Sequence, residues 1–116
     1  VIWLPGFPST WWREAITRLL AHAPAPALIA CDPDPAGIAI ALSAARLWQT
    51  CGLEWQPWKM AAADLAALTT RKPLTEHDRQ LLATLKTDAC ELPASLTELA
   101  SWMAEHGEKG EQEGYL

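Results

Sequence analysis

The stretch Ala27-Leu28-Ile29-Ala30-Cys31-Asp32-Pro33-Asp34-Pro35-Ala36-Gly37-Ile38 decides how the rest of the chain is arranged. Its first five residues form a short apolar run that predicts a buried strand, and an alanine-rich helix follows from Pro35. Asp32 and Asp34 stand where the strand ends and are separated by one residue. Because alternate residues of an extended chain point to the same side, both carboxylates are expected on one side of the backbone. Such a pair is suited to holding a divalent cation.

The same two aspartates also have a purely structural interpretation. Asp34 followed by Pro35 is a favourable N-cap and first-turn pair, so Asp34 could simply begin the helix. Asp32 followed by Pro33 fits a turn. From the local pattern alone, both interpretations stay open.

The segments on either side of this stretch alternate strands with helices. Before it, residues 1–4 predict a short, fully buried strand and residues 10–22 predict a helix. After it, residues 35–50 predict a helix and residues 53–58 a strand whose Pro57 favours the edge or the end of a sheet. Short connections of this kind favour right-handed crossovers and a parallel sheet. The expected fold class is therefore α/β, Rossmann-like, with a small parallel sheet flanked by helices.

The second half of the chain is mostly helical in its pattern. Residues 61–68 predict a short helix, which a polar break over residues 69–73 ends. Thr75-Glu76-His77-Asp78 has capping-box spacing and predicts a helix to about Lys86. The segment Ser95-Leu96-Thr97-Glu98 has the same spacing and predicts a last helix, which Gly107 ends.

The length and composition bound the domain organisation. A chain of 116 residues fits one domain, and a hydrophobic content of 50% with seven tryptophans is typical of a folded chain. We expect residues 1–107 to form a single α/β domain and residues 108–116 an acidic tail. Because Val1 already begins a strand, we expect the C-terminal part of a larger protein. Trp11 and Trp12 are adjacent, so only one of them can face the core.

Charge and cysteine usage exclude several classes of protein. The net charge is -5 and the basic residues stand singly, so no broad basic face is expected. Cys31, Cys51 and Cys90 are an odd, widely spaced set, which argues against a disulfide framework or a zinc site and favours a cytoplasmic location. No run reaches the roughly 18 apolar residues of a membrane span, so no membrane partner is expected. The oligomeric state is not indicated.

One family resemblance adds to these patterns. Asp32-Pro33-Asp34-Pro35-Ala36-Gly37 resembles the DxDxxG segment of Toprim domains, in the branch of the topoisomerase VI A subunits and the Wadjet-type nuclease subunits. Trp58-Lys59-Met60, the helix opening at Leu74-Thr75 and Glu111-Gln112-Glu113 are also similar to bacterial Toprim proteins of that branch. The resemblance implies a Toprim fold and binding of Mg²⁺, with Mn²⁺ as a substitute, by Asp32 and Asp34. It further implies DNA as the partner, with help from other domains, and a part in cleaving DNA phosphodiester bonds.

The chain departs from that family at the first strand. A Toprim domain normally carries a glutamate there, as a general acid/base or a metal ligand, but this chain has Pro5-Gly6-Phe7-Pro8. Either Glu111 or Glu113 supplies the missing catalytic acid, or the domain is a non-catalytic interaction module whose tail is solvated. The only tyrosine is Tyr115, so hydrolysis is favoured over a topoisomerase reaction. A phosphotransfer domain of another α/β family, with Asp32 as phosphate acceptor, is a third interpretation.

Overall fold

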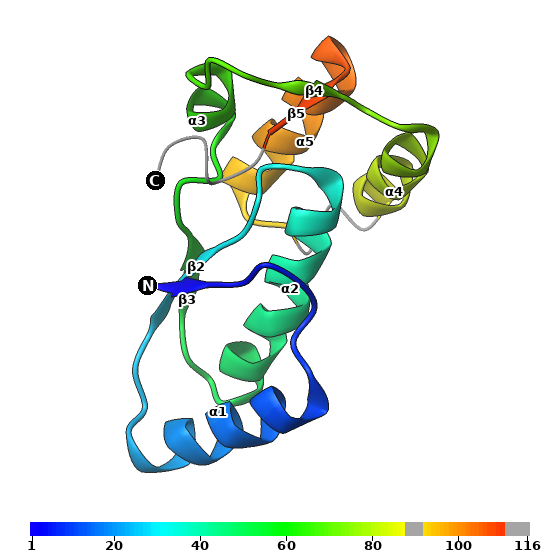
Figure 1. Ribbon diagram of the computed structural model, residues 1–116. Coiled ribbons are helices and arrows are strands. Elements are labelled where there is room, and N and C mark those ends of the chain that lie inside the picture. The colour runs from blue at the N-terminus through cyan, green and yellow to red at the C-terminus, as the bar shows by residue number, and fades with distance from the viewer. Residues whose placement is uncertain (88–91, 111–116) are drawn as a thin grey trace.

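The first half of the protein contains a three-stranded parallel sheet (Figure 1). The computed structural model describes residues 1–87 and 92–110. The strands are β1 (Ile2–Trp3), β2 (Ala27–Ala30) and β3 (Trp55–Pro57), and their order in the sheet is β1-β2-β3. Ile29 at the centre is level with Ile2 on one side and Pro57 on the other. The predicted α/β class with a small parallel sheet is confirmed, and β3 is an edge strand as its proline indicated.

Two helices cover one face of this sheet. Helix α1 (Thr10–His22) connects β1 to β2, and helix α2 (Pro35–Thr50) connects β2 to β3. Because the strands follow one another in the sheet in chain order, right-handed crossovers place both helices on the same face. Trp12 of α1 and Trp48 of α2 meet at 6.5 Å between ring centroids, and the Trp48 indole N–H donates to the Ala25 carbonyl at 3.1 Å.

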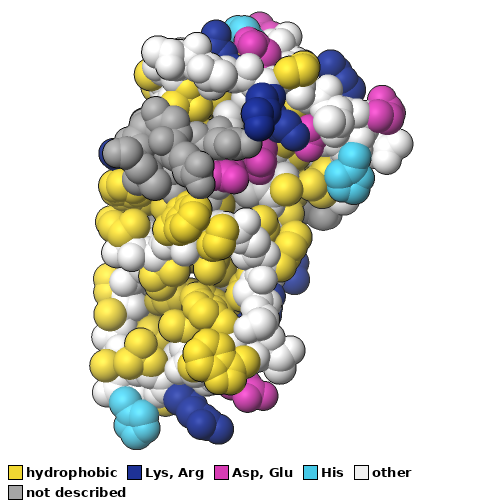
Figure 2. Space-filling view, viewed as in Figure 1, with side chains coloured by type: hydrophobic (Ala, Val, Ile, Leu, Met, Phe, Trp, Pro, Cys, Tyr) yellow, Lys and Arg dark blue, Asp and Glu magenta, His cyan; other side chains and the backbone are white. Residues whose placement is uncertain are grey.

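The opposite face of the sheet is only partly covered, and here the sequence prediction was wrong. Residues 1–4 were expected to be fully buried, but Val1 is 73% exposed, and Trp3 and Leu28 are 44% and 40% exposed. The reason is that helices cover one face only, so Trp3 of β1 and Leu28 of β2 remain in contact with solvent on the other face. Hydrophobic side chains accordingly gather over the half of the surface that holds the sheet and α1 (Figure 2).

The second half of the chain lies beyond the carboxyl ends of the strands (Figure 1). Within the described ranges no helix is long and apolar enough to cross a bilayer. Strands β4 and β5 pair antiparallel, with Lys72 level with Lys109. The elements of this half are α3 (Ala62–Ala66), β4 (Lys72–Pro73), α4 (Glu76–Thr87), α5 (Ala94–His106) and β5 (Glu108–Lys109).

Helix ends in this half were predicted with mixed success. The Thr75–Asp78 capping box is confirmed, because the Asp78 N–H donates to Thr75 Oγ1 and the Thr75 N–H donates to Asp78 Oδ2. The second proposed box was wrong: α5 begins at Ala94 after Pro93, without a side-chain cap. Gly107 ends α5 in the left-handed region, at φ 69°, as expected.

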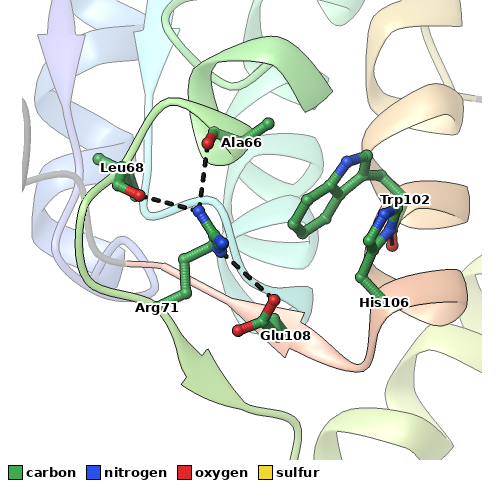
Figure 3. Close-up of polar contacts among 6 residues, drawn as sticks. All are labelled: Ala66, Leu68, Arg71, Trp102, His106 and Glu108. Carbon is green, nitrogen blue, oxygen red and sulfur yellow. Dashed lines mark hydrogen bonds and ion pairs between the residues drawn. The ribbon is translucent and has the colours of Figure 1, made fainter.

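Arg71 ties the two-stranded sheet to α3 (Figure 3). Its Nη1 donates to the carbonyls of Ala66 and Leu68 at 3.1 and 2.8 Å, and its Nε lies 3.3 Å from Glu108 Oε1. From the sequence, Glu108 was expected in an acidic tail and Lys72 in a polar break. Both residues instead belong to the short β4–β5 ladder, because Arg71 holds Glu108 next to the end of α3.

Candidate metal centre

The two predicted aspartates lie at the carboxyl end of the central strand. β2 ends at Ala30, whose carbonyl accepts the Leu4 N–H at 2.9 Å, and Asp32 follows two residues later. Asp34 is the N-cap of α2, with Oδ1 accepting the Gly37 N–H. Within the described ranges, Asp34 Oδ2 accepts no hydrogen bond. Asp34 therefore caps α2 with one of its two carboxylate oxygens.

Gly37 is what allows the loop to close on the helix. A Cβ built on this residue would lie 1.8 Å from the Asp32 carbonyl oxygen and 2.9 Å from Asp34 Oδ1. The first of these atoms belongs to the backbone, so it cannot move aside as a flexible side chain would. The glycine of the DxDxxG pattern is therefore required by the close approach of the aspartate loop to the first turn of α2.

Burial and like charge disturb the titration of this region. Burial raises the pKa of Asp34 to about 6, and the charge of Asp32 acts in the same direction, against the Gly37 N–H and the positive charge of Lys109. Burial, together with the charges of Asp32 and Asp34, also raises the pKa of the Cys31 thiol to about 12. A divalent cation bound here would relieve the repulsion between the carboxylates.

We expect Asp34→Asn to stabilise the protein above pH 6. The pKa of Asp34 is raised from 3.8 to about 6 on folding, so the native state holds the proton more tightly. The stability contributed by that proton is fully present below pH 4 and is lost as pH rises through 6, a loss of about 3 kcal/mol at most. Asparagine keeps the capping oxygen without the charge. Urea unfolding of the wild type and the variant at pH 4 and pH 8 should show a larger free energy of unfolding for the variant only at pH 8. Equal increases at both pH values would contradict a destabilising charge on Asp34.

The last described strand also reaches this loop, which the sequence did not indicate. The Gly110 N–H donates to the Pro33 carbonyl at 3.2 Å. A Cβ on Gly110 would lie 2.5 Å from Leu68 Cδ1 and 2.8 Å from Leu65 Cδ1, so the chain packs tightly at this point. Lys109, the preceding residue, forms an ion pair with Asp78 at 2.7 Å. In the sequence, residues 108–110 look like part of a charged tail, because no periodic pattern marks them as a strand.

The remaining predicted site residues are placed less fully. Glu111 and Glu113 lie outside the described residues; Glu111 directly follows Gly110 in the sequence. The end of β1 carries Pro5, Gly6, Phe7 and Pro8, so no carboxylate comes from that strand. In the part of the chain that the structure describes, no group of three or more His, Cys, Asp or Glu residues is placed to hold a metal ion.

Lys59 stands at the carboxyl end of the neighbouring strand β3. The Trp58 N–H donates to the Ile29 carbonyl, which sets the following lysine beside the end of β2. Lys59 is the non-glycine residue with positive φ in the described ranges, at 51°, and its Nζ lies 4.6 Å from the Trp58 ring centroid. A strained backbone at a strand end is common at functional sites.

A separate cavity of about 220 Å³ lies beside α4 and α5, away from the aspartates. Four apolar residues and two basic ones line it. The lining residues are Leu74, Arg79, Leu82, Ala83, Lys86 and Ala104.

The donor set at the strand end fits a hard divalent cation. Mg²⁺ prefers carboxylate oxygen, keeps several waters and is commonly held by one or two carboxylates together with a substrate phosphate. Asp32 and Asp34 supply two such groups, and the cap hydrogen bond to Gly37 uses Oδ1 of Asp34. The neighbouring thiol of Cys31 does not add to this donor set, because sulfur is a soft ligand and Mg²⁺ prefers oxygen.

Comparison with known proteins gives the chain a family but no activity. No curated protein matches the chain. The sequence model of a family described as "Protein of unknown function C-terminus (DUF2399)" matches residues 1–116, and the chain therefore belongs to this family.

Proposed function

We propose that this domain is a Toprim-type domain that binds Mg²⁺ through Asp32 and Asp34 and takes part in cleaving DNA phosphodiester bonds. The observation that carries the proposal is the carboxylate pair at the carboxyl end of the central parallel strand, which is the usual ligand position of open α/β sheets. The resemblance of Asp32 to Gly37 to the DxDxxG segment of Toprim domains supports it.

The residues have separate roles in this proposal. Asp34, which is held by its cap on α2, contributes one carboxylate, and Asp32 contributes the second. When bound, Mg²⁺ would neutralise charge on the scissile phosphate. Glu111 or Glu113 supplies the acid that is missing after β1. This assignment is supported by Gly110, which is hydrogen-bonded to Pro33 and directly precedes Glu111.

Titration with Mg²⁺, followed by calorimetry on the wild type and on Asp32→Asn, tests the metal site. We expect the wild type to bind Mg²⁺ and the variant to bind at least tenfold more weakly, because one of two carboxylate ligands is lost. Asp64→Asn is a matched control, since Asp64 also accepts a backbone N–H at a helix start but lies in α3. Absence of Mg²⁺ binding by the wild type would contradict the proposed metal site.

The pH dependence of Mg²⁺ binding adds a second readout. With a pKa of about 6, Asp34 is mostly protonated at pH 5 and ionised at pH 7. We expect binding at pH 5 to be roughly tenfold weaker than at pH 7, since the cation competes with the proton. Cleavage of plasmid DNA at pH 7.5, abolished by EDTA and by Asp32→Asn, would then test the reaction itself.

A second candidate function is favoured by the uncovered sheet face. Val1, Trp3 and Leu28 are exposed on this face, and they are three of the six large hydrophobic side chains that are exposed among the described residues; the others, Phe7, Trp11 and Leu19, lie in the following loop and on α1. Exposed apolar groups gathered in one region are typical of protein contact surfaces. A domain that binds no Mg²⁺ would favour a non-catalytic interaction module of the same fold.

A further inference from the structure

The last described strand brings a lysine to the edge of the sheet that carries the two aspartates. Lys109 precedes Gly110, whose N–H donates to Pro33, and Pro33 stands between Asp32 and Asp34. The end of β5 therefore lies against the loop that carries both aspartates, and its ammonium-bearing residue directly precedes the point of contact. A cation from β5 and two carboxylates from the end of β2 therefore share one region.

The position of Lys109 is fixed from several sides. Its Nζ lies 2.7 Å from Asp78 Oδ2, and the same oxygen accepts the Thr75 N–H at 2.9 Å. Burial acts to raise the pKa of Asp78, but hydrogen bonds from Lys109 and Thr75 outweigh this effect. The pKa of Asp78 is therefore lowered, and its carboxylate is charged in the ion pair. The ion pair of Arg71 with Glu108 anchors the residue before Lys109 (Figure 3).

This arrangement leaves part of the ammonium group available. A lysine ammonium has three N–H donors, and within residues 1–87 and 92–110 the structure gives Lys109 one ion-pair partner, Asp78. The Lys109 side chain is 22% exposed, whereas that of Asp78 is 8% exposed, so the lysine is the more exposed member of the pair. A rigidly held, partly exposed cation beside a candidate metal site is suited to an anionic oxygen of the ligand.

We propose that Lys109 forms a phosphate subsite next to Asp32 and Asp34, with Asp78 orienting its ammonium group. The subsite takes a phosphate or phosphodiester oxygen by a charge-assisted hydrogen bond, while the aspartates serve the cation. The inference rests on the proposed function, because it assigns the phosphate of that substrate to a particular residue. It adds a contact that remains when no metal is bound.

The test compares two variants that differ only in the cation. Removing Lys109 alone would leave the buried Asp78 carboxylate unpaired and threaten the fold. Asp78→Asn keeps the lysine charge, whereas Asp78→Asn/Lys109→Gln replaces the ion pair with two neutral amides. Titration of inorganic phosphate, followed by ³¹P NMR, is performed in EDTA and again in Mg²⁺. We expect the single variant to bind at least as tightly as the wild type and the double variant at least tenfold more weakly.

Lys72 provides the matched control, because it pairs with Lys109 across the β4–β5 ladder. Asp78→Asn/Lys72→Gln removes the same charge from the neighbouring strand and should bind phosphate like Asp78→Asn. Lys109→Arg, which retains the charge, should bind within threefold of the wild type. Equal losses in the two double variants, or no phosphate binding by the wild type in either buffer, would overturn the subsite. Phosphate binding in EDTA without any Mg²⁺ binding would leave the subsite standing and remove the metal proposal.

Discussion

Gly37→Ala is expected to destabilise the protein by about 3 kcal/mol and to abolish Mg²⁺ binding. The new methyl group would lie 1.8 Å from the Asp32 carbonyl oxygen, so either the loop or the first turn of α2 must shift. Overpacking against a rigid backbone costs energy of this order. The shift also breaks the hydrogen bond from Gly37 to Asp34 and moves both carboxylates. Urea unfolding followed by circular dichroism, with a Mg²⁺ titration of the folded protein, measures both effects.

Gly6→Ala is the control for this substitution. No atom lies within 4 Å of a Cβ built on Gly6, and its φ is outside the positive range. We expect a change within about 0.5 kcal/mol and unchanged Mg²⁺ binding. Similar losses in the two variants would show that the close approach at Gly37 has no special importance, because alanine acts on the unfolded chain in the opposite, stabilising direction.

Trp48→Ala is expected to cost about 3–5 kcal/mol of unfolding free energy. Trp48 is 3% exposed, packs against Trp12 and donates its indole N–H to Ala25. The substitution leaves a large cavity between α1 and α2 and an unpaired carbonyl before β2. Because the stability of such domains is about 5–15 kcal/mol in total, the variant should be close to unfolding. Urea unfolding by circular dichroism gives the value.

The comparison for Trp48 is Trp11→Ala, which removes the same side chain from the surface. Trp11 is 76% exposed, so its replacement should change the unfolding free energy by less than about 1 kcal/mol. A loss at Trp11 as large as that at Trp48 would mean that Trp11 is covered in solution. The prediction that one of Trp11 and Trp12 is exposed is confirmed, since Trp12 packs against the core.

Local patterns were sufficient for the elements that carry strong periodicity. The helices at residues 10–22 and 35–50 were predicted with the bounds observed, because Ser9 and Asp34 are good N-caps and the apolar spacing is regular. The burial of residues 1–4 was misjudged because an apolar run does not reveal how many faces of a sheet are covered. The strands β4 and β5 have two residues each, which is too short for any period to be recognised.

The candidate site was predictable only where its residues are close in sequence. Asp32, Asp34 and Gly37 lie in one motif, and spacing alone placed them at a strand end followed by a helix. Lys109 and Asp78 were missed as a pair, because long-range contacts depend on how α4 and β5 pack. The capping box correctly fixed Asp78 to the start of α4, but it gave no reason to expect a lysine partner from the end of the chain.

The hydrogen bond from Gly110 to Pro33 has a consequence for the order of events during synthesis. It joins segments far apart in the sequence, and closing so long a loop has a large entropic cost. This contact is therefore expected to form late in folding. Chains emerge from the ribosome N-terminus first. A nascent chain can therefore form the sheet and α2 before β5 has been translated, and at that stage the aspartate loop lacks Lys109. Completion of this edge of the sheet thus waits for translation of the segment around residue 110.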